Sequence, residues 1–488
     1  MSTKIFTAFY GYLMKHYAAF LVPAFIVGVS LLRASSLPEG DVFWSARNGM
    51  DTLSFGLQVM IPDVWNNQTL GEIWSPNSWL WNVLLGGFYV TFSTLGFFML
   101  VFLGNLFAYM IVWALTVRFK LHPFFQFYAV FFAWGALNVY MNGRANMADV
   151  IVVLLYALLL AYLLLPTRRI SSRKMVFTLA VTFLFAMLWM NLHLTGVLAV
   201  VVFPLVVLAY LNREVLRKKL LVAAAVAVVS AAGIICTPFG VDGLLKVLLV
   251  QDESSGFFLE WANILNAGPL TWGVLLTVVV GVVIGWAAYR DYSFVYTLGI
   301  IGFTVASLTV IRFQLFLAVL VIIGFMYLKE ELPVKLNPFS GVMSVIAVLL
   351  SVTLVTAGGF SVIRVLQYPS SILPARPNTF IGIPDGSVVA APVAESGVLI
   401  LYRQDSLVVL DGRNDLLGRD RFAAATNFFY ETDAKEAETW LTENGVDVVY
   451  LPDKEQYQGT VKVMEQLGWQ PVTIDGTVAY REKPITQV

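Results

Sequence analysis

A series of long apolar runs is the feature that most constrains this chain. Crossing a lipid bilayer as a helix takes roughly 17–25 apolar residues. The short apolar segment at 77–91 follows Pro76 and is expected to lie along the membrane as a helix that leads into the second span. About eleven crossings are expected, with twelve as the alternative. The predicted spans lie near 17–34, 94–117, 123–140, 149–166, 175–191, 195–211, 220–236, 272–289, 293–311, 313–328 and 339–358.

The composition agrees with a membrane protein. Of the 488 residues, 58% are hydrophobic and 13% are charged, whereas about 25% of a soluble protein is charged. Lipid must therefore be the solvent for most of the chain. The lone cysteine, Cys236, excludes an intrachain disulfide. No small-residue cleavage pattern follows the first apolar run, which favours a retained anchor over a removed signal peptide.

Clusters of Lys and Arg predict the orientation in the cell membrane. They fall on alternate connections between the spans, and such connections are cytoplasmic by the positive-inside rule. Every cluster is on a cytoplasmic connection if the N-terminus is also cytoplasmic. After eleven crossings, residues 359–488 then lie on the outer side together with the first loop, 35–93. The clusters are Arg118 and Lys120, Arg168 to Lys174, Arg213 to Lys219, Arg290, and Lys329 with Lys335.

The first outer loop is rich in acids and tryptophans. Tryptophan favours the membrane interface because one end of its ring is apolar and the other is wet. We therefore expect the loop to lie at that interface; the alternative is that it only anchors the neighbouring helices. Asp51 and Asp63 either assist chemistry or, as we favour, are solvated. The residues concerned are Asp41, Asp51, Asp63, Glu72, Trp44, Trp65, Trp74, Trp79 and Trp81.

Several other polar residues map to the same outer side. Ionisable groups at membrane depth are costly and usually functional. Taken singly, each has a structural alternative, since an arginine at a helix end reaches toward headgroups and a lone histidine often bonds a backbone carbonyl. Taken together with Asp41, they predict an outward cavity that suits a substrate carrying phosphate. They are Arg144, Asp149, Asn191, His193, Glu260 and Arg312.

Residues 359–488 form a different kind of sequence. They hold 11 Lys and Arg against 17 Asp and Glu, and short apolar or β-branched runs replace the long ones. Such runs predict strands, and 432–444 predicts a helix capped by Thr432 or Asp433. Gly445 is expected to end that helix. We predict a small α/β domain with a parallel or mixed sheet. The predicted strands are 387–393, 397–402, 406–410, 446–451 and 477–480.

A short polar motif, DGRND, directly follows the third predicted strand. Open α/β sheets place ligands at the carboxyl ends of their strands. Asp411, Arg413 and Asp415 are therefore candidates to bind sugar hydroxyls or the acceptor. In the alternative, the two acids brace a tight turn and Arg413 pairs with one of them. The sequence contains no GxGxxG, Walker or Cys/His metal-ligand spacing.

These motifs, in this order, resemble those of the bacterial GT-C superfamily of membrane glycosyltransferases, in a branch whose outer C-terminal domain carries a DGR-x-D motif. The resemblance implies a polytopic helical GT-C-like domain at 1–358 and an extracytoplasmic α/β domain at 359–488. Trp44-Ser45 and Asn77-Ser78 stand where that branch often has histidines, so the sequence departs there from residues that could bind a metal. No cofactor is assigned, and a divalent metal is the one considered. The matching residues are Asp41 in GDVFWSARNG, Arg144, Trp189-x-Asn191-x-His193, the Thr237–Gly240 turn, Glu260-Trp261, Arg312 and the Leu410–Gly418 motif.

The resemblance implies an enzyme that moves a sugar from a polyprenyl-phosphate donor to an extracytoplasmic acceptor, a glycan, lipid or protein of the cell envelope. Asp41 is then the catalytic base, while Arg144 and Arg312 stabilise the departing phosphate. A single acid acting on the acceptor implies inversion at C1.

Two other functions are weighed against this one. The alternative is a scaffold without catalysis that binds or moves a lipid-linked glycan. A secondary transporter is disfavoured because the spans lack acids at the bilayer midplane. Membrane lipid is an expected partner and nucleic acid is not. The expected substrate-binding residues are Arg144, Asn191, His193, Glu260, Arg312, Asp411, Arg413 and Asp415.

Overall fold

The chain forms two compact units in a computed structural model. One unit combines residues 1–35, 98–245 and 258–367, and the other combines 36–97 with 368–488. The second unit thus joins the first predicted outer loop to the C-terminal region. The structure describes residues 3–37, 39–165, 170–211, 214–243, 245, 264, 270–291, 293–328, 338–430, 433–474 and 477–483.

The first unit is helical, and every predicted span coincides with one of its helices. In the described part of the chain, seven helices are long and apolar enough to cross a membrane. The protein is therefore a multi-pass α-helical membrane protein, while the number of crossings stays a prediction. The helices are α1 (Thr3–Ala34), α4 (Thr94–Arg118), α5 (Pro123–Leu137), α6 (Asn146–Leu164), α7 (Ser172–Leu192), α8 (Ala199–Tyr210), α9 (Leu216–Ile235), α11 (Leu270–Arg290), α12 (Phe294–Thr309), α13 (Gln314–Gly324) and α14 (Pro338–Gln367). Short 3-10 turns lie at Asn138–Tyr140, Leu194–Leu198, Ile311–Phe313 and Phe325–Leu328.

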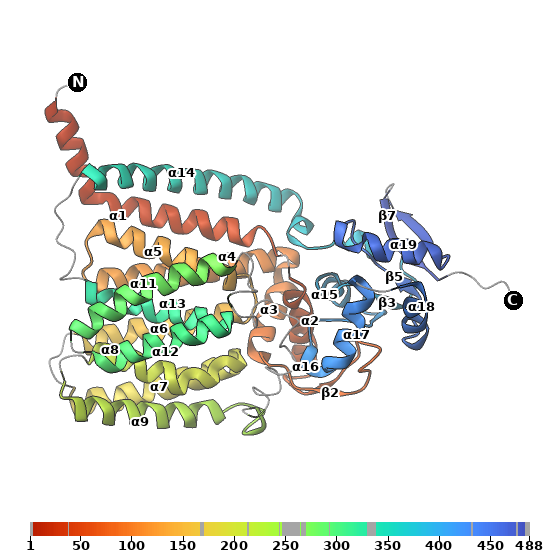
Figure 1. Cartoon of the computed structure of the whole chain (residues 1–488), viewed down its shortest axis with the longest axis horizontal. Helices are drawn as coiled ribbons and strands as arrows, with labels where there is room; N and C mark the ends of the chain where they lie inside the picture. Colours follow the sequence, from red (N-terminus) through yellow and green to blue (C-terminus); the bar gives the residue numbers. More distant parts are fainter. Residues whose placement is uncertain are drawn as a thin grey trace. The chain divides into compact units, whose positions relative to one another are not determined.

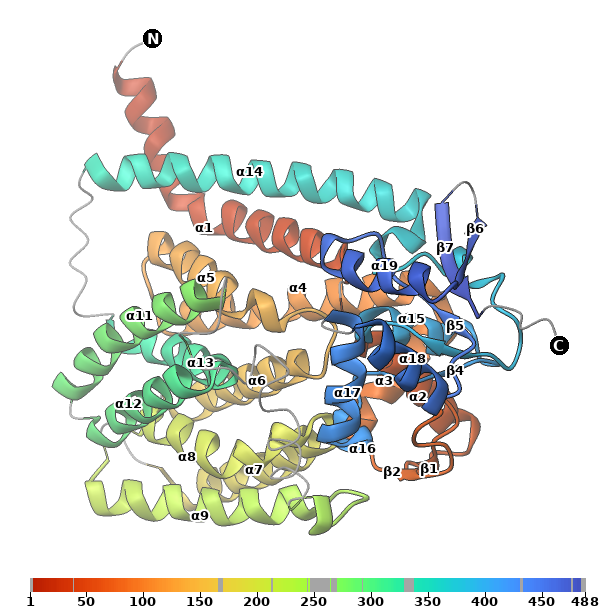
Figure 2. The ribbon, with the colours of Figure 1, turned by 45° about the vertical axis from the view of Figure 1, so that its right-hand side comes forward.

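Helices α1 and α14 run side by side in both views (Figures 1 and 2). Two glycines permit this approach. A Cβ placed on Gly28 would lie 2.8 Å from the carbonyl carbon of Leu354, and one on Gly358 would lie 2.9 Å from Cβ of Leu31. Small residues let apolar helices pack closely in a membrane. The first and last helices of the membrane unit are thereby joined.

The second unit contains a mixed five-stranded sheet, which confirms the α/β prediction for the C-terminal region. The strand order is β4-β3-β5-β7-β6, parallel from β4 to β5 and antiparallel beyond. The strands are β3 (Val388–Ala390), β4 (Leu407–Val408), β5 (Val448–Val449), β6 (Gln470–Ile474) and β7 (Thr477–Glu482). The helices are α15 (Val393–Tyr402), α16 (Asn414–Leu417), α17 (Arg419–Tyr430), α18 (Ala434–Glu443) and α19 (Gln458–Gln466).

The predicted strand at 397–402 is wrong, because this segment belongs to helix α15. Strands β3 and β4 are parallel, and parallel strands need a crossover connection between them. A short apolar run does not distinguish a buried strand from a buried helix by its period alone. The predicted helix at 432–444 is confirmed as α18: the Asp433 side chain accepts from the N–H groups of Lys435 and Glu436, and Gly445 follows with a φ of +61°.

The loop before the second span folds into the same unit. It forms α2 (Asp41–Ser54), β1 (Ile61–Pro62), β2 (Ile73–Trp74) and α3 (Trp79–Phe92). The backbone around residue 66 also pairs with the edge of the sheet, because the carbonyl of Trp65 accepts from the N–H of Val408 at 2.8 Å. Segments that are distant in the sequence, 36–97 and 368–488, therefore share one core.

Four of the five tryptophans in this loop are core residues. The side chains of Trp44, Trp65, Trp74 and Trp81 are buried, and Trp74 packs edge-on against both Trp44 and Trp65. The interpretation of these four as interfacial anchors is wrong. Their apolar rings fill a protein interior that the local sequence does not reveal, since the C-terminal region contributes Arg413 and Asp415 to it.

Candidate functional site

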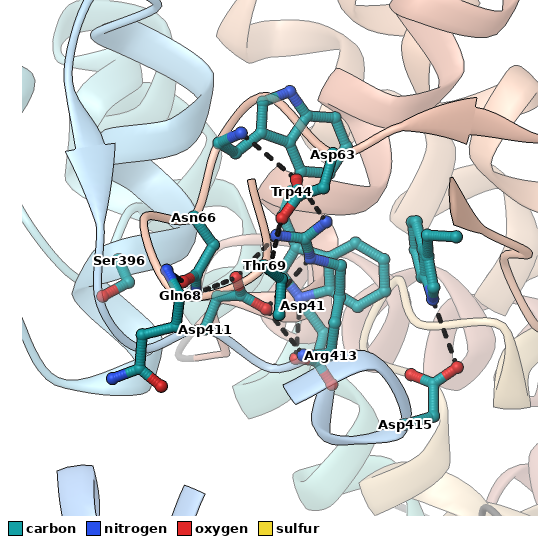
Figure 3. A network of polar contacts seen from close by, with 12 residues as sticks. Asp41, Trp44, Asp63, Asn66, Gln68, Thr69, Ser396, Asp411, Arg413 and Asp415 are labelled. Carbon is teal, nitrogen blue, oxygen red and sulfur yellow. Dashed lines mark hydrogen bonds and ion pairs between the residues drawn. The ribbon is translucent and has the colours of Figure 1, made fainter. Parts of the chain in front are cut away.

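Asp41 is the first residue of helix α2. A carboxylate is favoured there because the N–H groups at a helix N-terminus carry partial positive charge. Its Oδ1 accepts a hydrogen bond of 3.1 Å from Nε1 of Trp44. Asp41 is half-buried, and Figure 3 shows it beside the residues of the DGRND motif. The structure thus holds the candidate base in a defined orientation.

Arg413 lies at the centre of a buried ion cluster in the same unit (Figure 3). Its Nη1 donates to Oδ1 of Asp63 at 2.8 Å, and its Nη2 donates to Oδ2 of Asp411 at 2.7 Å. The arginine side chain is 1% exposed and both carboxylates are 0% exposed. The guanidinium also faces the rings of Trp65 and Trp74, at 4.5 and 5.2 Å from their centroids. Arg413 therefore stays charged within the core.

Neutral donors complete the coordination of the two acids. Asn66 Nδ2 donates to Oδ2 of Asp411 at 3.0 Å, and Thr69 Oγ1 donates to Oδ2 of Asp63 at 2.5 Å. Burial by itself raises the pKa of Asp411, but the charge and hydrogen bonds of Arg413 outweigh it and leave this pKa below its usual value. The same two carboxylates raise the pKa of Arg413 against the effect of its burial.

This geometry favours the alternative in which the DGRND motif braces a turn. Arg413 pairs with Asp411, and also with Asp63, which the sequence did not suggest as its partner. The interpretation of Asp63 as a solvated loop residue is wrong, since its side chain is 0% exposed. Asp415 is half-buried in α16 and accepts from Nε1 of Trp74 at 3.2 Å. The motif therefore ties the C-terminal region to the loop before the second span.

A second polar cluster lies in the membrane unit, around Asp149. This residue sits in the first turn of α6 and is 1% exposed. Its carboxylate accepts from Nε1 of Trp189 and Oγ1 of Thr195, both at 2.7 Å. Nδ1 of His193 lies 2.8 Å from its other oxygen. Three groups, one from the last turn of α7 and two from the turn that follows it, therefore converge on one buried acid.

Arg312 extends this cluster. Its Nη2 lies 3.2 Å from Nε2 of His193 and 3.3 Å from Oδ1 of Asn146. Arginine is always a donor, so Nε2 must accept and Nδ1 must carry the proton that is given to Asp149. The result is a chain from buried Asp149, through His193, to the half-buried guanidinium of Arg312.

The remaining predicted residues are placed as follows. Arg144 is half-buried and follows Gly143, which has a φ of +93°, two residues before α6. Asn191 donates from Nδ2 to the carbonyls of Met187 and Cys236, both at 2.8 Å, and so joins α7 to the end of α9. Glu260 lies outside the described residues. Within the described ranges, no group of three or more His, Cys, Asp or Glu is placed to hold a metal.

Sequence reasoning missed the residues that anchor these side chains. Asn146 and Thr195 were not singled out, and Asp149 was placed on the outer side without a partner. A signal was available for Asp149, since an acid in the first turn of an apolar helix is unusual and needs donors. No comparable signal existed for the pairing of Asp63 with Arg413.

Solved structures, but no curated sequences, are similar to this chain. No protein-family model matches the sequence, and no curated protein sequence matches it. The archaeal oligosaccharyltransferase AglB from Archaeoglobus fulgidus, solved with an inhibitory peptide and a dolichol-phosphate, is similar over 90% of this chain and 69% of its own, with a TM-score of 0.52 and 12% identity. ArnT from Cupriavidus metallidurans, solved bound to undecaprenyl phosphate, is similar over 98% of both chains, with a TM-score of 0.50 and 15% identity. The chain therefore shares its fold with these two proteins.

Proposed function

We propose that the protein transfers a sugar from a polyprenyl-phosphate donor to an acceptor hydroxyl on the extracytoplasmic side of the membrane. The observation that carries the proposal is the guanidinium of Arg312, held half-buried by the Asp149 and His193 chain. The fold adds support, because AglB and ArnT were solved with dolichol-phosphate and undecaprenyl phosphate.

Arg312 and Arg144 are the proposed ligands of the donor phosphate. A guanidinium matches the geometry of phosphate oxygens, and its charge offsets the charge that grows on the departing group. The buried partners of Arg312 fix its position before substrate binds, so little ordering is needed later. The polar residues in this outer turn, His193 and Asn191, then shape the site around the phosphate.

Asp41 is the proposed general base. The acceptor oxygen forms a bond to C1 of the sugar while the bond from C1 to the phosphate oxygen breaks. The acceptor proton passes to Asp41, and the polyprenyl phosphate leaves with the electron pair of the broken bond. Attack from the face opposite the phosphate gives inversion at C1. Such proton transfer typically contributes about 10²–10⁴ in rate.

The test is sugar transfer in membranes from a panel of radiolabelled polyprenyl-phosphate sugars. Asp41→Asn is expected to lose about a hundredfold or more of the rate. Asp51→Asn is the matched control, because Asp51 lies in the same helix and pairs with Arg47 at 2.9 Å; it is expected to retain transfer. Undiminished transfer by Asp41→Asn contradicts the assignment of the base.

Arg312→Ala separates binding from the chemistry at Asp41. It is expected to raise KM for the donor and to weaken binding of the unglycosylated polyprenyl phosphate. Binding that is unchanged contradicts the phosphate assignment. If no donor supports transfer while the natural chain still binds polyprenyl phosphate, the protein is instead a scaffold for a lipid-linked glycan.

A further inference from the structure

The loop after β4 approaches Asp41 so closely that a side chain at position 412 would displace the Asp41 carboxylate. A Cβ placed on Gly412 would overlap Oδ1 of Asp41 and would lie 2.8 Å from Nε1 of Trp44. The φ of Gly412 is outside the left-handed region, so its backbone does not itself require glycine. The requirement comes from the carboxylate and the indole that face it.

A second glycine of the C-terminal region contacts the residue before Asp41. A Cβ on Gly397, in α15, would overlap the carbonyl oxygen of Gly40 and lie 2.8 Å from its Cα. A Cβ on Gly40 would in turn lie 2.5 Å from the carbonyl oxygen of Val393. Two backbones are therefore in direct contact at the start of α2.

The ion cluster prevents the loop from retreating. Both neighbours of Gly412 belong to it, since Asp411 and Arg413 are bonded to each other and Arg413 is bonded to Asp63. The N–H of Arg413 also donates to Oδ1 of Asp411 at 2.8 Å. The backbone at Gly412 is thus held in place, and it restricts the position of the Asp41 carboxylate that lies against it.

We propose that Gly412, together with Trp44, positions the Asp41 carboxylate for proton transfer, so that the C-terminal region belongs to the catalytic apparatus. This inference rests on the proposed function, in which Asp41 is the base. A general base must come within about 2.6–3.2 Å of its proton donor, and a misplacement of about 1 Å costs on the order of a hundredfold in rate. Gly412 and Trp44 are positioning residues, not groups that contact the reacting atoms.

Gly412→Ala is the direct test. The added methyl meets the ends of side chains and not a backbone, so the side chains are expected to shift while the fold persists. We expect kcat to fall about 10- to 100-fold, with KM for the donor within about threefold of the natural value. Gly459→Ala is the control, because a Cβ on Gly459 meets nothing within 4 Å and the residue lies in α19 of the same unit.

Trp44→Phe supplies a readout that a purely structural role would not move. Phenylalanine keeps a ring against Trp74, whose centroid is 5.5 Å from that of Trp44, but it cannot donate to Asp41. A hydrogen bond to a carboxylate favours its charged form. The acid limb of the pH–rate profile is therefore expected to move to higher pH in this variant and to stay in place in Gly459→Ala.

The outcomes separate this inference from the proposed function. If Asp41→Asn is inactive while Gly412→Ala keeps the natural kcat, the positioning role is refuted and the base assignment stands. If Asp41→Asn transfers sugar at the natural rate, the base assignment fails and this inference fails with it, whereas the transferase activity itself stands. If no donor supports transfer by the natural chain, the proposed function fails. If Gly412→Ala loses the protease resistance of the folded unit, the pH–rate profile of Trp44→Phe becomes the test. An acid limb at the same pH as in the natural chain then refutes the positioning role.

Discussion

Replacing Arg413 by methionine is expected to open the second unit. The substitution leaves two buried carboxylates, Asp63 and Asp411, without the cation that lies within 2.8 Å of each. Removing one partner of a buried ion pair costs about 3–5 kcal/mol. We take about 4 kcal/mol here, because two acids lose their partner while methionine keeps some contact with Trp65 and Trp74. At about 1.4 kcal/mol for each factor of ten, the open population rises roughly a thousandfold.

Native-state proteolysis of the intact protein in lipid nanodiscs measures that population. When opening is fast compared with cleavage, the cleavage rate follows the fraction of open molecules. Arg413→Lys is the first comparison, and it keeps the charge but not the forked geometry. Its cleavage rate should therefore lie between those of the natural chain and Arg413→Met. The triple variant Asp63→Asn, Arg413→Met, Asp411→Asn removes all three charges and is expected to recover much of the loss.

Two outcomes would contradict a stabilising role for the ion cluster. Cleavage of Arg413→Met at the natural rate would show that the ion cluster does not hold the unit together. A triple variant that opens as readily as Arg413→Met would show that the cost does not arise from unpaired buried charge.

The remaining predictions concern the same unit. The pKa of Asp411 is lowered by its partners despite its burial, so the stability it contributes is fully present above its unfolded-state pKa, about 3.9, and is lost as pH falls through the lower folded value. Proteolysis with an acid-active protease should therefore accelerate below about pH 4 in the natural chain and should depend less on pH in Asp411→Asn. The same pH dependence of cleavage in both chains would contradict the role of Asp411. Asp433→Ala removes the cap of α18 and should cost about 1 kcal/mol in denaturant unfolding, whereas Asp433→Asn should cost less; equal losses would rule out the cap as the cause.

The helical framework was predictable because its signal is local. Lipid-length apolar runs identify membrane helices by length and composition alone, and each predicted span coincides with a helix. The cap at Asp433 and the stop at Gly445 were likewise encoded within a few residues. The segment 397–402 failed because its identity as helix α15 depends on β3 and β4 being parallel neighbours, which is a property of the whole sheet.

The candidate site was predictable as a set of residues but not as a set of contacts. Asp41, His193 and Arg312 were singled out by their chemistry, yet His193 and Arg312 have their partners Asp149 and Asn146 in another segment of the chain. Arg413 bonds to a residue 350 positions away, and no pattern in either segment indicates the other. The tryptophans were misread for the same reason, since composition alone does not distinguish a ring at a lipid surface from one in a distant core.

The pairing of the loop before the second span with the C-terminal region also determines the order in which the protein is completed during synthesis. Asp63 is made early, whereas Arg413 follows 350 residues later, which at about 5–20 residues per second is a delay of roughly 20–70 s. For most of that interval the ribosome is delivering membrane helices, the last of which ends at Gln367, and the loop lacks its counter-ion and its neighbouring strand. The second unit is consequently completed only when translation is nearly finished. A prematurely terminated chain therefore carries an unfolded loop that quality-control proteases can recognise.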